Sequence, residues 1–401
     1  MGLLTTTPEG TRACAALFPF DDLVIVSDRL TERGLEPHDH VMDVASPSLL
    51  LASVTMRLPA ESALDLCTGS GVQAFLTARH ATRVVAVDIN PRALNFAAFG
   101  ARLNGIENVE VREGDLFEPV GDARFDLVLA NPPYVVSPET GLLFRDGGLP
   151  GDSFSERLVR RAPDFLEPGG YAHLVVNWAH RADEHWSAPI RRWVAESGCD
   201  VLVLHQTSQG PLDYAALWNR GLRHDGAAYA AALDRWVEYH RQHGIEAIGS
   251  GVVILRRRDG SNWIRAEELS SELLLPADHH IARLIENQDY LAAHDDGALS
   301  NDRFQLVDDH LLDETLRLGE GERIRRRVLR LENGLRWQVA LDANTVAVLS
   351  RLDGRRPLRE VLMDAAAAAD EQAPPPDRFL EAGLSAVRRL LELGFVVPTA
   401  S

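Results

Sequence analysis

The chain contains no lysine, so all 41 of its basic residues are arginines, and 59 acidic residues outnumber them. We interpret the missing lysine as the mark of a GC-rich, bacterial genome and not as a feature of the protein's chemistry. The resulting net charge of −18 opposes long-range attraction to RNA or DNA, because nucleic-acid binders present a basic surface to the phosphates. Composition therefore makes nucleic acid a less favoured partner.

Cysteines are few and long apolar runs are missing. The three cysteines are an odd, scattered set, which predicts neither disulfides nor zinc. No apolar run approaches the length of a membrane span, and the first residues lack the basic start and apolar core of a secretion signal. We therefore expect a cytoplasmic protein without a membrane partner. The cysteines are Cys14, Cys67 and Cys199.

Histidines occur in two close pairs, His38 with His40 and His279 with His280. Neither pair has cysteine or acidic residues at the spacing of metal ligands. We therefore interpret all four as solvated loop residues and expect no metal.

The most informative segment is an apolar run that stops at a double proline. Residues 125–130 are expected to form a buried strand of a parallel sheet, and Asn131-Pro132-Pro133-Tyr134 follows directly. Because consecutive prolines cannot donate hydrogen bonds to a sheet, the strand must end there. The turn offers an amide, a carbonyl and an aromatic ring at the edge where open α/β sheets bind ligands. This set suits a flat nitrogen-bearing group held by two accepted hydrogen bonds and one stacking contact.

Three further strands are expected to end in an aspartate at the same edge. They are predicted at residues 62–66, 83–87 and 109–112, with Asp65, Asp88 and Asp115 at or just beyond their ends. The first leads into a Gly-Ser-Gly turn and a helix, where backbone N–H groups approach a ligand closely. Asp88 follows about twenty residues later, the usual position of a carboxylate that binds ribose hydroxyls. An aspartate at position 65, where a dinucleotide fold needs glycine, argues against a nicotinamide enzyme.

Together these segments resemble the seven-stranded class of S-adenosylmethionine-dependent methyltransferases. Residues 65–71, Asp-Leu-Cys-Thr-Gly-Ser-Gly, match a first motif that commonly reads Asp-Leu-Gly-x-Gly-x-Gly. Cys67 replaces its first glycine, which should tolerate the cofactor and tighten the loop. The Asn-Pro-Pro-Tyr turn narrows the resemblance to the branch that methylates planar nitrogens. That branch includes release-factor glutamine, adenine exocyclic-amine and ribosomal guanine methyltransferases, and the resemblance covers roughly residues 40–256.

The resemblance implies S-adenosylmethionine as the cofactor. It places Asp88 on the ribose and Asp115 with Leu116 beside the adenine, while Asp65 suits a cationic amino-acid moiety. The implied cofactor-binding residues are Asp65, Cys67, Thr68, Gly69, Gly71, Asp88, Ile89, Asp115, Leu116 and Asn131.

The resemblance also implies the catalytic residues Asn131, Pro132 and Tyr134. The Asn131 side-chain oxygen and the Pro132 carbonyl would accept hydrogen bonds from the NH₂ group of the methyl acceptor. Tyr134 would stack on the plane of that acceptor.

From these residues we expect an α/β fold with a Rossmann-like seven-stranded sheet and helices on both faces. The expected function is N-methylation of a planar amide or amine nitrogen of a protein side chain or a small metabolite. One alternative is an rRNA or tRNA base methyltransferase acting on an adenine or guanine exocyclic amine, which a basic surface near Tyr134 would favour. Others are a natural-product tailoring methyltransferase acting on another heteroatom, and a cofactor-binding protein without turnover.

Two side chains beyond the turn are candidate substrate contacts. Arg145 lies in the loop-like segment 137–153 and could hold a carboxylate or a carbonyl. An Arg–Asp pair that orders this loop is an equally weighted alternative. Trp178 ends a predicted fifth strand, residues 174–178, near the same rim.

Residues 211–244 stand where this fold needs only a short hairpin, between predicted strands at 200–204 and 251–255. Aromatic residues and leucines recur there mostly at three- and four-residue steps, which predicts two helices. Such an insertion either shapes the substrate entrance or supports a neighbouring domain, and we favour the entrance.

The expected domains are an N-terminal element (1–45), the methyltransferase domain (46–256), a linker or helical segment (257–302) and a small α+β domain (303–401). In the last, a strand at 337–341, helices at 343–352, 357–369 and 379–393 and a closing strand resemble a winged-helix module. The arginine run 323–330 is expected to form a strand with one solvated cationic face. We expect this domain to contact proteins, with a homodimer as one candidate, and not to read DNA.

Overall fold

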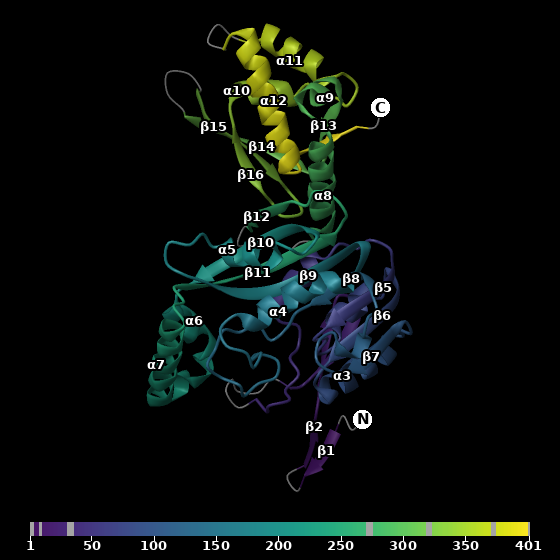
Figure 1. Ribbon diagram of the computed structural model, residues 1–401, viewed down its shortest axis with the longest axis vertical. Coiled ribbons are helices and arrows are strands. Elements are labelled where there is room, and N and C mark those ends of the chain that lie inside the picture. Colours follow the sequence, from purple (N-terminus) through teal and green to yellow (C-terminus); the bar gives the residue numbers. More distant parts are fainter. Residues whose placement is uncertain are drawn as a thin grey trace. The chain divides into compact units, whose positions relative to one another are not determined.

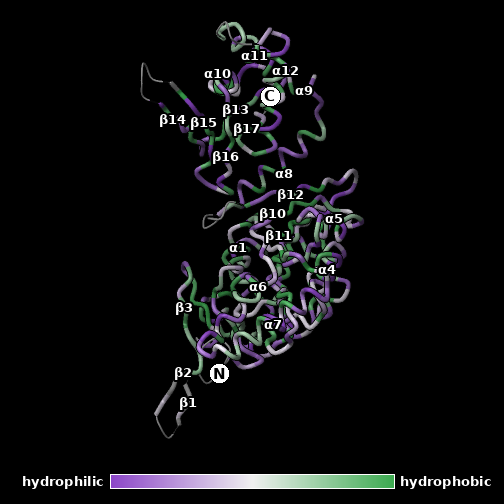
Figure 2. Tube along the Cα trace, turned by 90° about the vertical axis from the view of Figure 1, so that its left-hand side faces the viewer, coloured by the Kyte–Doolittle hydropathy of each residue, from purple (hydrophilic) through white to green (hydrophobic). Residues whose placement is uncertain are grey.

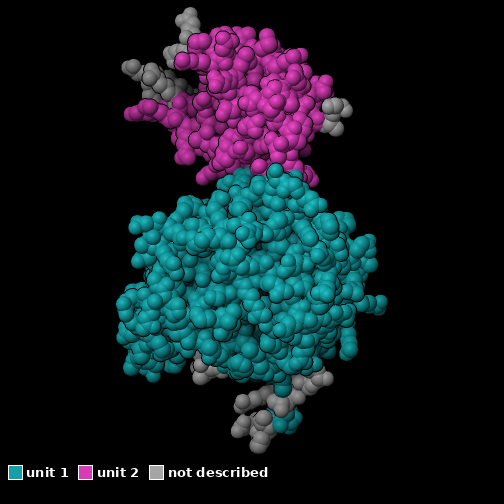
Figure 3. Space-filling model, viewed as in Figure 1, with its two compact units in different colours: residues 1–271 teal, residues 272–401 magenta. Residues whose placement is uncertain are grey.

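In a computed structural model of the protein, the described residues are 4–7, 10–29, 36–269, 276–317, 323–369 and 374–399. The chain divides into two compact units, residues 1–271 and 272–401 (Figure 3).

Unit 1 is built on an eight-stranded sheet with the order β12-β10-β11-β9-β8-β5-β6-β7 (Figure 1). Neighbouring strands are parallel, except that β11 runs antiparallel to both β9 and β10. The strand order reverses at the β5–β8 pair, and such a reversal opens a crevice at the carboxyl ends of the strands. The strands are β5 (Ala60–Leu66), β6 (Ala81–Asp88), β7 (Val109–Glu113), β8 (Phe125–Ala130), β9 (Leu166–His180), β10 (Cys199–Gln209), β11 (Ala247–Arg257) and β12 (Ile264–Glu268).

The α/β fold class is confirmed, but the sheet has one strand more than expected. β12 pairs in parallel with β10, from Ile264 opposite Val201 to Glu268 opposite His205. Its sequence, Ile-Arg-Ala-Glu-Glu, carries the charged residues that suit an edge strand and lacks a clear apolar alternation. Unit 1 therefore continues beyond residue 256, into the segment that the sequence marked as a linker.

Helices cover both faces of the sheet. On one face, α4 (Ser153–Arg161) and α5 (Ala188–Val194) contribute Leu158 and Ile190 to the core. On the other face, α2 (Val72–Thr77) and α3 (Pro91–Leu103) pack around Phe75 together with β4 (Leu23–Ser27), and α1 (Ser46–Val54) covers β9. The remaining elements of this part are the strands β1 (Leu4–Thr7), β2 (Gly10–Ala13) and β3 (Ala16–Phe20) and the 3₁₀ turns η1 (Glu118–Val120) and η2 (Ala162–Phe165).

The insertion between β10 and β11 is helical, as predicted. It consists of α6 (Pro211–Trp218), the 3₁₀ turn η3 (Arg220–His224) and α7 (Gly226–Gln242). The Asp225 side chain caps α7 by accepting hydrogen bonds from the backbone N–H groups of Ala227 and Ala228. Within the described ranges, no helix has the length and apolar character needed to cross a membrane.

Unit 2 begins earlier than the predicted domain boundary at residue 303. The helix α8 (Asp278–Ala293) packs into its core: Asn287 Nδ2 donates to the carbonyls of Leu391 (2.8 Å) and Val396 (2.9 Å). The other elements are α9 (Asp296–Asn301), β13 (Phe304–Leu306), β14 (His310–Arg317), β15 (Arg323–Leu331), β16 (Gln338–Leu341), α10 (Ala343–Leu349), α11 (Leu358–Ala367), α12 (Pro376–Glu392) and β17 (Val396–Pro398). The winged-helix resemblance stays a prediction.

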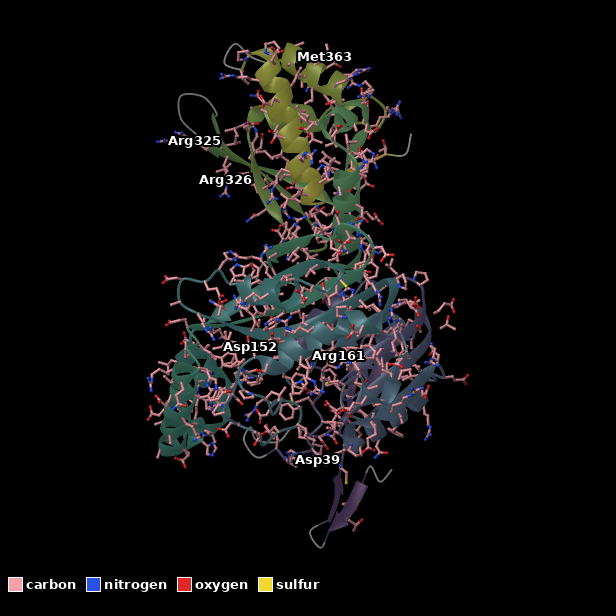
Figure 4. All side chains as sticks on the ribbon, in the orientation of Figure 1. Asp39, Asp152, Arg161, Arg325, Arg326 and Met363 are labelled. Atoms are coloured by element: carbon pink, nitrogen blue, oxygen red, sulfur yellow. The ribbon has the colours of Figure 1, made fainter. Side chains whose placement is uncertain are left out.

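The arginine run forms the central strand of the β14-β15-β16 sheet, in agreement with the predicted strand. Along β15 the hydropathy colours of Figure 2 are mixed, because its five arginines are interspersed with isoleucine, valine and leucines. Arg327 and Arg330 form cross-strand ion pairs with Glu314 and Asp313 of β14, each at 2.7 Å. Arg325 and Arg326 are exposed (Figure 4).

The solvated-histidine interpretation is wrong for two of the four residues. His40 is 6% exposed, and His280 is 2% exposed, with its Nε2 3.0 Å from the Leu393 carbonyl. His279, the neighbour of His280 on the same helix, points outward with its side chain 98% exposed. Among the described residues, no group of three or more His, Cys, Asp or Glu side chains is arranged to hold a metal ion.

One buried histidine gives unit 1 a specific pH dependence. His173 of β9 lies between Leu129 and Ile254 on the neighbouring strands and is fully buried. Neither of its ring nitrogens has a hydrogen-bond partner in the part of the chain that the structure describes. Burial lowers its pKa from 6.5 to about 3. The unfolded chain binds this proton below about pH 6.5 and the folded chain does not, so stability falls as the pH drops below that value.

Between pH 7.5 and 5.0, His173 should therefore remove about 2 kcal/mol from the free energy of unfolding. We expect His173→Leu to lose correspondingly less stability over this range. Urea unfolding of the parent and the variant at both pH values measures the difference. An identical pH dependence in the two proteins would contradict the prediction.

Candidate active site

A cavity of about 1260 Å³ lies in unit 1, where β5, β6, β7 and β8 end. Its walls come from residues 36–49, from the loops after these strands, from residues 131–149, and from α6 and η3 of the insertion. The sequence-predicted site residues line it, with the exceptions of Gly71 and Trp178. The structure therefore brings together side chains that lie up to 80 residues apart in the sequence, from Asp65 to Arg145.

The loop after β5 owes its shape to left-handed backbone conformations. Cys67, Gly69 and Gly71 have φ angles of 55°, 55° and 90°. A Cβ atom on Gly71 would lie 2.5 Å from the Phe75 ring, so only glycine fits there. Gly71 thus shapes the loop from behind without lining the cavity. Cys67 occupies a left-handed conformation that costs a non-glycine residue roughly 1 kcal/mol. This cost explains why the position is usually glycine in the class of methyltransferases that the motif resembles.

Asp65 organises this loop from inside. It is 1% exposed, and its Oδ2 accepts hydrogen bonds from Thr68 Oγ1 (2.6 Å) and from the Ala74 backbone N–H (3.0 Å). Burial, aided by the nearby charge of Asp88, raises the pKa of Asp65 to about 7. The carboxyl group is therefore poised to titrate near neutrality.

Asp88 links the ends of β5 and β6. Its Oδ2 accepts from the Gly69 backbone N–H (2.8 Å), and its Oδ1 accepts from the Asn90 backbone N–H (2.9 Å). Burial raises the pKa of this carboxyl group. Because each carboxylate oxygen can accept a second hydrogen bond, both stay able to bind ligand hydroxyls. The next residue, Ile89, is 54% exposed and presents an apolar side chain to the cavity.

Asp115 and Leu116 occupy the far wall of the same region. Asp115 forms an ion pair with Arg157 of α4 at 3.1 Å. Leu116 is 5% exposed and has a φ angle of 48°, so its side chain mainly belongs to the core while still touching the cavity.

The Asn-Pro-Pro-Tyr turn presents two hydrogen-bond acceptors. Asn131 Nδ2 donates to Ser48 Oγ of α1 at 3.1 Å, which fixes the orientation of the amide. Among the described residues, neither Asn131 Oδ1 nor the Pro132 carbonyl oxygen receives a hydrogen bond, and both residues line the cavity. Tyr134 also lines it, and its ring packs against an aromatic cluster of the insertion. Burial raises the pKa of the Tyr134 hydroxyl, so this group stays protonated.

Arg145 forms the Arg–Asp pair that the sequence analysis gave as the alternative to a substrate contact. Its Nε and Nη2 donate to the two carboxylate oxygens of Asp146, at 2.7 and 3.0 Å. The guanidinium lies over the Trp236 ring, 5.8 Å from the centroid. Asp146 in turn accepts hydrogen bonds from Leu142 and Ser137, so the pair orders the loop while it lines the cavity.

The placement of Trp178 at the substrate is wrong. Trp178 is fully buried on the α4–α5 face of the sheet, where its Nε1 donates to the Trp186 carbonyl at 2.7 Å. Successive residues of a strand point to opposite faces. The preceding residue, Asn177, therefore points to the other face and donates to the Tyr214 hydroxyl at 2.8 Å. The prediction therefore placed Trp178 at the correct end of β9 but on the wrong face of the sheet.

Residues 36–49 form a wall that the sequence did not predict. His38 Nδ1 lies 2.8 Å from the Gly141 carbonyl, and the Leu143 N–H donates to the His38 carbonyl. Gln73 Nε2 donates to the Ser48 carbonyl at 2.8 Å, next to the hydroxyl that holds Asn131. The only local signal was a helix start at Ser46-Pro47, which says nothing about where that helix packs.

The cavity is not basic. Four arginines line it, and three of them form ion pairs with carboxylates of the same lining. Asp65 and Asp88 add further acidic groups, so carboxylates outnumber arginines. The paired arginines are Arg145, Arg157 and Arg235, and the fourth is Arg220.

Comparison with known proteins agrees with this geometry. Residues 38–192 match the family model described as Methyltransferase small domain, and residues 282–398 match one described as Domain of unknown function (DUF7782). The ribosomal protein uL3 glutamine methyltransferase of Bradyrhizobium diazoefficiens is 44% identical over 123 residues, which cover 27% of this chain and 39% of that protein. The release factor glutamine methyltransferase of Geobacter sulfurreducens is 38% identical over 126 residues, covering 28% and 44%.

A third relative is matched over most of its length. The "Putative protein N5-glutamine methyltransferase" of Methanocaldococcus jannaschii is 33% identical over 148 residues, covering 35% of this chain and 74% of that protein. The chain therefore belongs to the methyltransferase small domain family. It spans less than half the length of the other two relatives.

Membership in this family implies S-adenosylmethionine as the methyl donor, and the site fits it. The buried carboxyl group of Asp65 suits a cation, and the oxygens of the partly buried Asp88 suit hydroxyl groups. The glycine-shaped loop leaves room for a ligand against its backbone. The half-exposed Ile89 supplies an apolar contact. The cavity also exceeds the 300–1,000 Å³ of typical small-molecule sites, which leaves space for part of a second molecule.

The affinity for this cationic ligand should depend on the titration of Asp65. Below about pH 7 the carboxyl group is protonated in the free protein, and ionisation is favoured when a cation binds beside it. We expect the Kd for S-adenosylmethionine to be about eightfold higher at pH 6.0 than at pH 7.5. Calorimetric titration at both values measures this ratio, and Asp65→Asn should remove most of it. Equal ratios in parent and variant would contradict the prediction.

Proposed function

We propose that this protein transfers a methyl group from S-adenosylmethionine to the side-chain amide nitrogen of a protein, with glutamine as the residue. The observation that carries the proposal is the pair of acceptors at the turn, Asn131 Oδ1 and the Pro132 carbonyl, both at the cavity and both without a partner among the described residues. An NH₂ group has two N–H bonds, so it satisfies both acceptors at once. The names of the three relatives agree with glutamine as the acceptor.

The chemistry follows from what these residues can hold. The bound sulfonium supplies a methyl group that is already activated. An amide nitrogen is a poor nucleophile because its lone pair is delocalised, so the protein must fix the direction of that lone pair. Two accepted hydrogen bonds orient the nitrogen and favour the positive charge that develops on it as the N–C bond forms and the S–C bond breaks. The surplus N–H proton then leaves to solvent.

A protein acceptor fits the charges of the cavity better than RNA does. An RNA base would bring phosphates to the entrance, where arginines should meet them. Three of the four lining arginines are already neutralised by carboxylates. A neutral amide requires no such cations.

The test is methyl transfer from labelled S-adenosylmethionine to a bacterial extract that is separated into protein, RNA and small-molecule fractions. Asn131→Ala serves as the blank. We expect label in protein, and mass spectrometry of the labelled protein should place it on a glutamine side chain. Label confined to RNA or to metabolites would overturn the protein proposal and name the acceptor class instead.

A further inference from the structure

The insertion between β10 and β11 contacts the loop that follows the Asn-Pro-Pro-Tyr turn at several points. The nearest is Val136, which lies two residues after Tyr134. Its backbone N–H donates to the Tyr214 hydroxyl of α6 at 3.1 Å. Its carbonyl oxygen lies 2.9 Å from His240 Nε2 of α7. Both polar groups of one buried residue are therefore satisfied by side chains of the insertion.

These two side chains are themselves fixed. Tyr214 is 2% exposed, and its hydroxyl also accepts from Asn177 Nδ2 at the carboxyl end of β9. His240 is fully buried, and its ring meets those of Tyr214 and Trp236 edge-on, at 5.9 and 6.2 Å between centroids. Because a carbonyl can only accept, His240 must carry its proton on Nε2. Burial lowers its pKa, which keeps the ring neutral in that role.

Further contacts extend the attachment along the same loop. Arg235 and Trp236 Nε1 both donate to Glu139, at 2.5 and 3.3 Å. The Tyr239 hydroxyl accepts from the Gly151 N–H at 2.7 Å. Near the far end, Asp152 at the start of α4 (Figure 4) accepts from the Ala179 N–H and ties this end to β9.

The insertion also reaches the cavity itself. Leu217, Trp218 and Leu222 form part of its wall, and Tyr134 packs against the same cluster as Trp218. The elements that position the turn thus also border the space left beyond the cofactor residues.

We infer that Tyr214 and His240 are positioning residues that hold the Asn-Pro-Pro-Tyr turn in its productive geometry through the two peptide groups of Val136. The inference rests on the proposed function only in what the turn does, and not in how it is held. Removing either contact leaves a buried backbone group without its partner, and loosens a turn that prolines alone do not anchor.

The experiment compares Tyr214→Phe, His240→Leu and His240→Gln with the parent. Tyr214→Phe deletes one hydroxyl and keeps the ring in its cluster. Glutamine at position 240 can still donate from Nε2 to the Val136 carbonyl, whereas leucine cannot. The matched controls are Tyr229→Phe, whose hydroxyl makes no hydrogen bond among the described residues, and His279→Leu, which replaces a 98% exposed histidine of α8.

The primary readout is amide hydrogen exchange of the peptides that cover residues 131–151, measured without any acceptor. We expect exchange about tenfold faster in Tyr214→Phe, and faster exchange in His240→Leu than in His240→Gln. Exchange in β5 and β6 should stay unchanged. Parent-like exchange of residues 131–151 in both Tyr214→Phe and His240→Leu overturns the inference, whatever the activities are.

The second readout is methyl transfer to the labelled protein fraction. We expect kcat to fall about tenfold in Tyr214→Phe and His240→Leu while the Kd for S-adenosylmethionine stays within twofold, with His240→Gln close to the parent. Faster exchange with parent-like kcat in both variants overturns the positioning role. A parent that transfers no methyl group counts against the proposed function alone, because the exchange measurement still decides how the turn is held.

Discussion

Asn131→Ala should lower kcat by about 100- to 1000-fold, the loss seen when one preorganised hydrogen-bond partner of a transition state is removed. The variant deletes Oδ1, one of the two acceptors at the cavity, and leaves the Pro132 carbonyl to orient the acceptor nitrogen alone. Cofactor affinity should stay nearly unchanged, because the loops after β5 and β6 hold most of the ligand. Initial rates at saturating cofactor and a separate calorimetric Kd measure the two quantities.

The control for Asn131→Ala is Asn301→Ala, which removes an exposed amide in unit 2. It should leave both quantities at the parent value. Ser48→Ala is an informative companion, because it keeps Oδ1 but removes the hydrogen bond that fixes the amide. We expect the kcat of Ser48→Ala to lie between those of Asn131→Ala and the parent. Turnover by Asn131→Ala equal to that of the parent would refute the assignment of the turn.

Asp88→Ala should raise the Kd for S-adenosylmethionine by about 10- to 100-fold, the range for hydrogen bonds to a charged group. The carboxylate would bind the ribose, and it also holds the backbone N–H groups of Gly69 and Asn90. Its removal therefore takes away a ligand contact and loosens the loop after β5. Calorimetric titration of the variant gives the ratio directly.

Asp122→Ala is the matched control for Asp88→Ala. Asp122 is an exposed aspartate in the turn before β8 and lies outside the cavity lining. The Asp122→Ala variant should bind S-adenosylmethionine with the same Kd as the parent. A similar Kd in all three proteins would mean that Asp88 serves the loop alone and does not touch the ligand.

The ends of β5 and β8 could be predicted from the sequence because prolines or glycines follow them, and these residues do not continue a strand. Pro132 and Pro133 stop β8, and Gly69 with Gly71 turn the chain after β5. The parallel pairing of β5, β6, β7 and β8 then brings the residues after them to one edge. Local signals and one topological rule were enough to place most of the cavity.

The errors arose where a single strand position or a distant contact decides the outcome. Trp178 and Asn177 are neighbours at the right rim, and only the direction of the first side chain assigns it to the core. A fully buried strand lacks the apolar alternation that would have revealed this direction. The hydrogen bonds of Ser48, Tyr214 and His240 join residues about 80 to 100 positions apart. No periodicity within either segment encodes such pairs.

The two ends of the insertion lie next to each other, on paired residues of the neighbouring strands β10 and β11. Gln209, which closes β10, pairs with Ile248 near the start of β11, so the chain leaves the sheet and returns at adjacent points. An arrangement of this kind allows whole helices to be exchanged or lengthened by evolution, or grafted by an engineer, without breaking the strands beneath them. In this protein, exchanging the insertion would also remove Tyr214 and His240, the two side chains that hydrogen-bond to Val136. Any transplanted module would have to supply its own hydroxyl and imidazole, or their equivalents, at the same two points.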